Sequence, residues 1–283
     1  MSKMDEYIDR VRHLPPAPAV VGQLLGLLSD PNRNLERIVE LIGYDPSLTA
    51  EVLKRCNSAF FRGAEPASDI FEAVSRLGFY EVYCVVVALM AARTISLAPA
   101  KGALDPNVLW KHSVTTAVAA SALAVRVQEP EAVAFTAGLL HDVGKLILAS
   151  VEPQVYSNLL AQSGSSGPAL AGAEAAALGV THADVGSRLL ARWGLPTPVA
   201  IAVQYHHQPP TAASPYERLA AIVHLSNILA HHTTQGDGAP LDPATLRPEL
   251  LKLTDVEPDD LPYMLGQTKS GLVRVEGLLQ LTG

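Results

Sequence analysis

A histidine–aspartate pair stands inside an apolar stretch, in the segment Gly138-Leu139-Leu140-His141-Asp142-Val143-Gly144-Lys145. Apolar residues on both sides predict that the pair is buried within a helical run. An imidazole next to a carboxylate is costly to bury unless hydrogen-bond partners or a metal ion compensate it. Neighbours on a helix point about 100° apart, so the two side chains need different partners. A chain with this segment must therefore fold so that other polar groups converge on residues 141 and 142.

Histidines elsewhere in the chain are the candidate partners. The candidate metal ligands are His112, His141, Asp142, His182, His206 and His207. Imidazole and carboxylate together suit Fe, Mn or Zn, and two ions can be held where enough ligands converge. Two neighbouring ions would activate a water molecule and hold a phosphoryl group during hydrolysis.

Spacing alone leaves a structural interpretation equally open, because a single buried histidine in a helical protein is commonly a hydrogen-bonded core residue. Lys145 is a candidate to meet a phosphate, or is a solvated lysine one turn past the pair. No role is assigned to the remaining histidines, and two of them are expected near a helix C-terminus, where cations are favoured. These four are His13, His224, His231 and His232.

Helix patterns dominate the chain and predict an all-α fold. Hydrophobic residues make up 48% of the chain and aromatic residues only 5%, which favours close-packed helices over sheet. We find no alternating strand pattern and no internal repeat. Helices are predicted over 35–42 behind Asn34, from Asp45-Pro46 to about 56, and over 70–77 before Gly78.

The second part of the chain is predicted to continue in helices. They cover about 108–127, 130–150 and 153–162, then a helix capped by Thr181, one from Leu195-Pro196, and one over 215–232. Segments 163–167 and 233–240 are predicted loops, and a short helical tail follows. Segment 97–106 has Pro and Gly without periodicity. It is the expected junction between two subdomains, residues 1–100 and residues 101–283.

Composition limits the classes of partner. A formal net charge of −7 argues against bulk nucleic-acid binding, although a local basic pocket for a small phosphate ligand stays open. Cys56 and Cys84 are the two cysteines, and they fit buried thiols in a reducing cytosol better than a disulfide framework. The charged segment 1–12 does not resemble a secretory signal, and the apolar run 83–92 is too short to span a bilayer. We expect a cytoplasmic protein that does not enter the membrane.

Several motifs in order resemble a known family. His141-Asp142-Val143-Gly144-Lys145 resembles the signature of the HD phosphohydrolase superfamily, and the order of the histidines resembles its HD-GYP branch, which degrades cyclic di-GMP. Other stretches resemble the HDOD domain, the HD-related output domain of bacterial signalling proteins. They are Leu14-Pro15-Pro16, Asp45-Pro46-Ser47-Leu48-Thr49, Asn57-Ser58-Ala59-Phe60, Ala73-Val74, Leu77-Gly78, Glu174, Gly179 to Gly186, Trp193-Gly194-Leu195-Pro196 and His206-His207-Gln208-Pro209.

This resemblance covers roughly residues 10 to 235 and implies an N-terminal helical subdomain packed on a degenerate HD-type subdomain. It also implies an output or scaffold role without catalysis. Three departures count against hydrolysis. Asn227 stands where the superfamily places its last metal-binding Asp, Gln208-Pro209-Pro210 replaces the Gly-Tyr-Pro loop of the HD-GYP enzymes, and Val108 replaces a Glu ligand. A neutral amide is a poorer ligand for a divalent ion than a carboxylate.

Three functions are therefore weighed. The favoured one is a non-enzymatic signalling module that binds signalling proteins in trans and senses a small nucleotide or a metal in its remnant pocket. The second is a metal-dependent phosphodiesterase, in which the six ligands hold the metals and Lys145 steadies the phosphate. The third is a purely structural helical adaptor.

Overall fold

The protein was analysed as a computed structural model, which describes residues 2–11, 19–28, 35–43, 45–58, 66–95, 104–163, 167–209, 215–235 and 241–279. Throughout these ranges every regular element is an α-helix or a short 3-10 turn, so the predicted all-α class is confirmed. Asn34, Leu14-Pro15-Pro16, Pro210 and most of the predicted junction 97–106 lie outside the described residues.

Five helices of the first hundred residues pack on one another. They are α2 (Ala19–Leu28), α3 (Leu35–Gly43), α4 (Pro46–Cys56), α5 (Ile70–Leu77) and α6 (Phe79–Ile95). Helix α6 contacts α2, α4 and α5, and it carries a nearly continuous buried run from Val82 to Leu89. A helix that is apolar on all sides is buried on all sides, which explains why α6 lies at the centre of this group.

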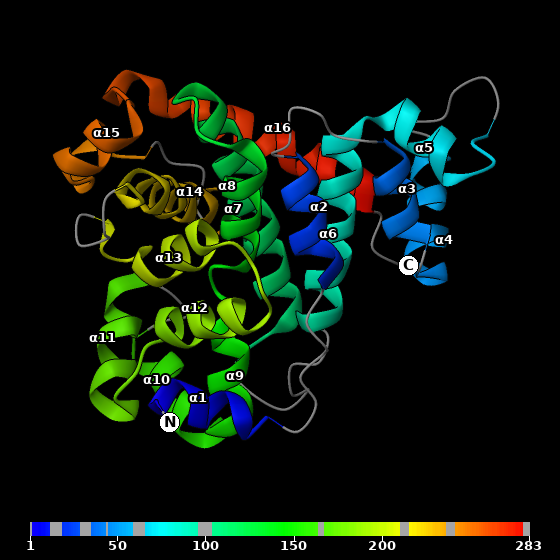
Figure 1. The fold of residues 1–283 in the computed structure, drawn as a ribbon. Coiled ribbons are helices and arrows are strands. Elements are labelled where there is room, and N and C mark those ends of the chain that lie inside the picture. Colours follow the sequence, from blue (N-terminus) through cyan, green and yellow to red (C-terminus); the bar gives the residue numbers. More distant parts are fainter. Residues whose placement is uncertain are drawn as a thin grey trace.

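Helix α7 (Pro106–Arg126) begins the second group of helices and contacts α8, α14 and α16 (Figure 1). The remaining helices of this group pack on these or on one another. In order they are α8 (Glu131–Leu140), α9 (Val143–Val151), α10 (Pro153–Ser163), α11 (Gly167–Leu178), α12 (His182–Arg192), α13 (Thr197–Tyr205), α14 (Glu217–Gln235), α15 (Pro248–Thr254) and α16 (Leu261–Leu279). Two 3-10 turns, Pro243–Thr245 and Pro258–Asp260, flank α15.

Contacts join the two groups of helices in one hydrophobic core. Helix α6 packs on α7 and α8, and α16 reaches across α7 to α6. Helix α1 (Lys3–Asp9) lies beside α9 and α12 at the far end of the second group, as Figure 1 shows at the N-terminus. Ion pairs Arg188–Asp5 and Arg192–Asp9, each 2.7 Å, hold it there. The division into 1–100 and 101–283 therefore stays a prediction.

Several predicted helix ends are confirmed by their caps. The Asp45 carboxylate accepts a hydrogen bond from the Leu48 backbone N–H (3.0 Å), as expected for the start of α4. Helix α5 ends at Gly78, which has a φ of +86° that favours glycine. Thr181 and Asp184 form a capping box at the start of α12.

Other helix predictions are wrong in their continuity or their ends. The single helix predicted over 130–150 is broken at His141-Asp142 into α8 and α9. Helix α11 was not predicted, because its Ala- and Gly-rich segment GPALAGAEAAAL has no apolar period. Helix α14 continues to Gln235, three residues past the predicted end, and α16 with 19 residues is no short tail.

Two helical stretches are long and apolar enough to cross a membrane by length and composition, Pro106–Arg126 and Glu131–Val151, and the bent pair α5–α6 would make a third. Neither stretch contains the apolar run 83–92, which is too short by itself to span a bilayer. However, 61% and 89% of the two windows are buried inside the protein, as core helices are. A cytoplasmic location stays a prediction.

Candidate functional site

The break between α8 and α9 shapes the centre of the site. His141 ends α8 with helical backbone angles, and Asp142 begins α9 at φ −99° and ψ 6°. The break brings the two side chains together, with His141 Nε2 3.3 Å from Asp142 Oδ2. The continuous helix predicted over 130–150 is therefore wrong at this pair, although the two side chains do have different partners.

A close approach of two helices delivers the next ligand. A Cβ atom on Gly144 of α9 would lie 2.0 Å from the backbone oxygen of His182 and 2.8 Å from the backbone nitrogen of Gly186. Only glycine lets α9 and α12 pack this closely. As a result, His182 Nε2 lies 3.3 Å from Asp142 Oδ1, across from His141.

His112 reaches the pair from α7. Gly138 of α8 packs against α7, where an added Cβ would lie 3.0 Å from the Ala117 Cα atom. The His112 Nε2 atom is 3.3 Å from His141 Nε2 and 3.8 Å from Asp142 Oδ2. Two small residues at the contact thus bring the α7 histidine within reach of the His-Asp break.

The His206-His207 pair follows the last turn of α13. His207 Nε2 lies 2.9 Å from His182 Nε2, and the ring centre of His206 is 5.1 Å from that of His141. The structure therefore brings all six predicted ligands together. They form two groups whose ligand atoms lie within 4.8 Å of one another: His112, His141 and Asp142 in the first, and His182, His206 and His207 in the second.

Asp142 connects the two groups. Its Oδ2 atom faces His141 and His112, and its Oδ1 atom faces His182. None of the six side chains is more than 6% exposed. Burying a carboxylate and five imidazoles is costly unless hydrogen bonds or opposite charges compensate it.

Lys145 supplies part of this compensation. Its Nζ atom donates a hydrogen bond of 2.7 Å to Asp142 Oδ2, and both side chains are buried. Burial acts to raise the pKa of Asp142, but His141 and Lys145 outweigh it and hold that pKa well below its ordinary value. Asp142 is therefore ionised, and Lys145 is not the solvated lysine that the sequence left open.

Burial also keeps several of the histidines neutral. It lowers the pKa of His112 and of His206 well below the ordinary value, with neighbouring histidines acting in the same direction. The pKa of His207 is lowered for the same reasons. A neutral imidazole has a free nitrogen lone pair, which is the state that binds a metal.

Hydrogen bonds determine which ring nitrogen faces inward. His141 Nδ1 lies 2.7 Å from the Gly138 carbonyl oxygen, and His206 Nδ1 lies 2.7 Å from the Val203 carbonyl oxygen. His182 Nδ1 lies 2.7 Å from Glu174 Oε2. Since these oxygens only accept, each Nδ1 carries a proton and each Nε2 atom faces the site.

Polar atoms of the site remain without hydrogen-bond partners, as far as the described parts of the chain are concerned. They are His206 Nε2, His112 Nδ1, His207 Nδ1 and Asp142 Oδ1. Orphaned buried acceptors are rare in proteins and indicate an unseen water or ion. The residues present therefore fit a bound Fe, Mn or Zn ion, whose ligands are imidazole and carboxylate.

Helix α14 contacts this site through polar side chains to which the sequence assigns no role. His224 Nδ1 donates a hydrogen bond of 2.5 Å to the His206 carbonyl oxygen, and the His231 ring stacks on His112 with centres 4.2 Å apart. Asn227 is 5% exposed and lies one turn from each of them, on the same helix face. The sequence assigns these two histidines no role, because their partners His206 and His112 are distant in sequence.

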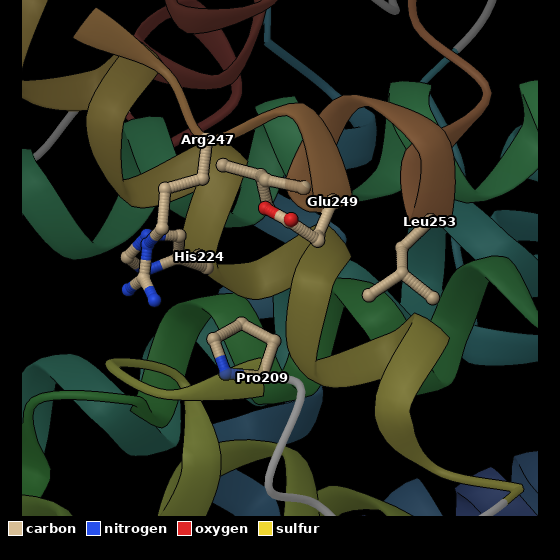
Figure 2. Close-up of a pocket in the computed structure, with 6 residues that line it drawn as sticks. Pro209, His224, Arg247, Glu249 and Leu253 are labelled. Carbon is tan, nitrogen blue, oxygen red and sulfur yellow. The ribbon is translucent and has the colours of Figure 1, made fainter.

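The outer side of His224 faces a small pocket. Pro209, Arg247, Glu249, Leu250 and Leu253 line it together with His224, and Figure 2 shows Arg247 and His224 close together above Pro209. The volume of about 10 Å³ is roughly that of one water molecule. This pocket is therefore too small for a ligand larger than water.

An all-helical domain with a buried His-Asp cluster is the arrangement of HD-type proteins. The HDOD domain family model matches residues 14–209, which is more than half of the chain. The chain belongs to the HDOD domain family.

Solved structures agree with this assignment. An HDOD domain protein of unknown function from Geobacter sulfurreducens is 25% identical, with a TM-score of 0.74 over 99% of this chain and 97% of that one. A protein from Marinobacter aquaeolei VT8 with a provisional signal-transduction name is 24% identical, with a TM-score of 0.75 over 99% and 64%. A protein from Shewanella amazonensis SB2B with a provisional phosphohydrolase name is 22% identical, with a TM-score of 0.69 over 98% and 95%.

One curated relative is an uncharacterized protein of Treponema pallidum (strain Nichols). It is 28% identical over 222 residues, which are 78% of this chain and 42% of the relative. The chain thus spans less than half the length of this relative.

Proposed function

We propose that the protein is a non-enzymatic signalling module of the HDOD family, which binds other signalling proteins in trans and holds a metal ion in its core. The observation that carries the proposal is the convergence of six ligand side chains, none more than 6% exposed, around the ionised Asp142. A group this well buried suits a resident ion that stabilises one conformation.

The donor set supports Fe, Mn or Zn as the ion. The Nε2 atoms of His141, His182 and His206 face inward, and Asp142 supplies the anionic oxygen. A bound ion would act as a Lewis acid on whatever oxygen ligand it met. The residues themselves hold the ion, exclude water by burial and keep the imidazoles neutral.

Two features of this chain argue against hydrolysis. A phosphodiester must reach the ligands from solvent, yet the ligand side chains are almost completely buried. In addition, Asn227 offers α14 no negative charge, and the charge of Asp142 is shared with Lys145 at 2.7 Å. Two divalent ions would face a single carboxylate, which balances little of their charge.

Membership of the HDOD family supports the signalling role, as does the provisional name of the Marinobacter aquaeolei VT8 structure. The negative net charge of −7 argues for protein partners rather than bulk nucleic acid.

The alternative is a metal-dependent phosphodiesterase. One observation favours it, because the two oxygens of Asp142 face the two ligand groups, as a bridging carboxylate between two ions would. In that case Lys145 would steady the phosphate. Cyclic di-GMP is the substrate to test, since the motif order resembles the HD-GYP branch.

The test combines elemental mass spectrometry with a cyclic di-GMP hydrolysis assay on untagged protein purified without chelators. We expect about one equivalent of Fe, Mn or Zn and no hydrolysis above that of the Asp142→Ala variant. His206→Ala should lose metal, whereas His232→Ala, a histidine beyond the ligand groups on the same helix as Asn227, should keep it.

Two results would overturn the proposal. Hydrolysis at enzyme rates that Asp142→Ala abolishes would establish the phosphodiesterase. Metal below about a tenth of an equivalent after anaerobic supplementation would leave the cluster as a structural remnant of an adaptor.

A further inference from the structure

Three inward-facing histidines of the site have their Nδ1 protons held in different ways. His141 and His206 donate to backbone carbonyl oxygens three residues earlier in their own helices. His182 donates to the carboxylate of Glu174, a residue of another helix, at 2.7 Å. Of these three, therefore, His182 is the histidine whose ring is oriented by a negative charge.

Glu174 holds His182 through two groups at once. Its Oε2 atom also accepts the backbone N–H of His182, at 2.8 Å. That N–H is at the first position of α12, where a helix has no internal acceptor for it. One oxygen thus holds both the first backbone N–H of α12 and the His182 ring.

A tyrosine orients the carboxylate in turn. The Tyr156 hydroxyl on α10 donates to Glu174 Oε1 at 2.8 Å. Tyr156, Glu174 and His182 are all buried, with exposures of 1%, 0% and 0%. Burial and the charge of Glu174 raise the pKa of Tyr156 well above its ordinary value, so the hydroxyl remains a donor.

We infer that Glu174 and Tyr156 are positioning residues that hold His182 in the Nδ1-protonated form, with its Nε2 atom ready to bind a metal. This inference rests on the proposed metal site and specifies how one of its ligands is prepared. A carboxylate behind a ligating histidine fixes its orientation and raises its basicity, and loss of such a partner costs about 10- to 100-fold in metal affinity.

The form of His182 determines which histidine donates in its contact with His207. In the inferred form the His182 Nε2 atom accepts, so its contact of 2.9 Å with His207 Nε2 requires the proton to be on His207. In the metal-free protein His207 is therefore the donor and His182 the acceptor. His182 and His207 would both help to hold a bound ion.

The experiment uses ¹⁵N-histidine-labelled full-length protein, with the His182 signals assigned through the His182→Asn variant. In metal-free protein we expect a protonated Nδ1 and an unprotonated Nε2 at His182. Glu174→Gln keeps the size and one acceptor but removes the charge. It should move His182 toward a mixture of both forms and weaken Zn²⁺ binding by about 10- to 100-fold.

Two further variants separate positioning from simple packing. Tyr156→Phe removes only the donor to Oε1 and should weaken Zn²⁺ binding a few-fold with the fold intact. Glu152→Gln removes a carboxylate that pairs with Arg10 at 2.8 Å, and it should change neither readout.

The inference is overturned if His182 is protonated at Nε2 in the unaltered protein, a result that needs no variant to fold. It is also overturned if Glu174→Gln leaves both the nitrogen signals and the Zn²⁺ affinity unchanged. If the unaltered protein binds no Zn²⁺, the proposed function fails, whereas the nitrogen signals of the metal-free protein still decide the role of Glu174.

Discussion

The two groups of helices differ in what they bury. Among the residues described before position 104, Arg55 and Thr94 are the buried polar side chains, and the packed interior of α2 to α6 is otherwise apolar. From α7 onward the core contains the histidine cluster, Asp142, Lys145, Glu174 and several hydroxyl groups. The first group is stabilised by apolar burial, whereas the second must also compensate buried charges.

This difference indicates where each kind of change should act. An apolar core loses stability in proportion to the contacts removed and stays uncharged over the whole pH range. A core of neutral histidines and a salt-bridged carboxylate depends on its protonation state. Changes in pH should therefore act mainly on the second group of helices.

Acid should destabilise the protein by acting on the buried histidines of the second group of helices. Burial lowers the pKa of His112, His206, His207 and His224 from the ordinary 6.5. Below that value the unfolded chain binds protons that the fold does not, so stability is complete above pH 6.5 and falls as the pH decreases. Each histidine contributes up to about 1.4 kcal/mol per pH unit, so four approach about 5 kcal/mol per unit.

Urea unfolding of chelator-treated protein between pH 8 and pH 5 measures this effect. The His206→Gln variant should show a shallower slope, by about a quarter if the four groups titrate independently. A free energy of unfolding that is flat from pH 7 to pH 5 would show that the buried histidines are already charged in the fold.

Among substitutions that add one methyl group, Gly144→Ala should destabilise the protein most. The added Cβ would meet the backbone of His182 at 2.0 Å, and neither backbone can move away without separating α9 from α12. We expect a loss of about 3 kcal/mol or more, at the upper end for overpacking, together with loss of metal. Gly172→Ala, in a helix with no atom within 4 Å of the new Cβ, is the control and should be neutral or slightly stabilising.

The measurement is the urea midpoint of both variants with metal content on the same samples. If Gly144→Ala keeps full stability, α9 and α12 are not in the close contact that brings His182 to Asp142.

The features that sequence could predict are mostly local. The caps at Asp45, Gly78 and Thr181 act within four residues of themselves, so composition and spacing identify them. The convergence of the six ligands came from motif order in a resemblance, and the structure brings them together. Their role as metal ligands is still a prediction.

What sequence could not predict depends on contacts between distant residues. The helix break at His141-Asp142 accompanies the packing of Gly144 on His182, almost forty positions later. Helix α11 has no amphipathic pattern to reveal it, although it carries Glu174. His224 and His231 are recognisable as site neighbours only when α14 is seen lying on His206 and His112.

Leu48→Ala tests the first group of helices. Leu48 is fully buried on α4, far in sequence from the ligands, and its loss leaves a cavity. We expect a cost of about 3 kcal/mol, within the range for buried leucines. Metal content should be unchanged under conditions where the variant remains folded.

Elemental analysis of the folded variant decides the outcome. Loss of metal at a urea concentration where circular dichroism still reports full helix content would mean that the two groups of helices act as one unit. The contrast between them would then fail.

The smallest expected effect comes from the cap beside His182. In Thr181→Ala the capping box with Asp184 is lost, which costs about 1 kcal/mol, while Thr181→Ser keeps the hydroxyl and should cost less. Zn²⁺ affinity should change by less than about 3-fold, because Glu174 still holds both the ring and the backbone N–H of His182. Calorimetric titration of the two variants measures this. A loss of affinity as large as in Glu174→Gln would mean that the helix cap, rather than the buried carboxylate, positions His182.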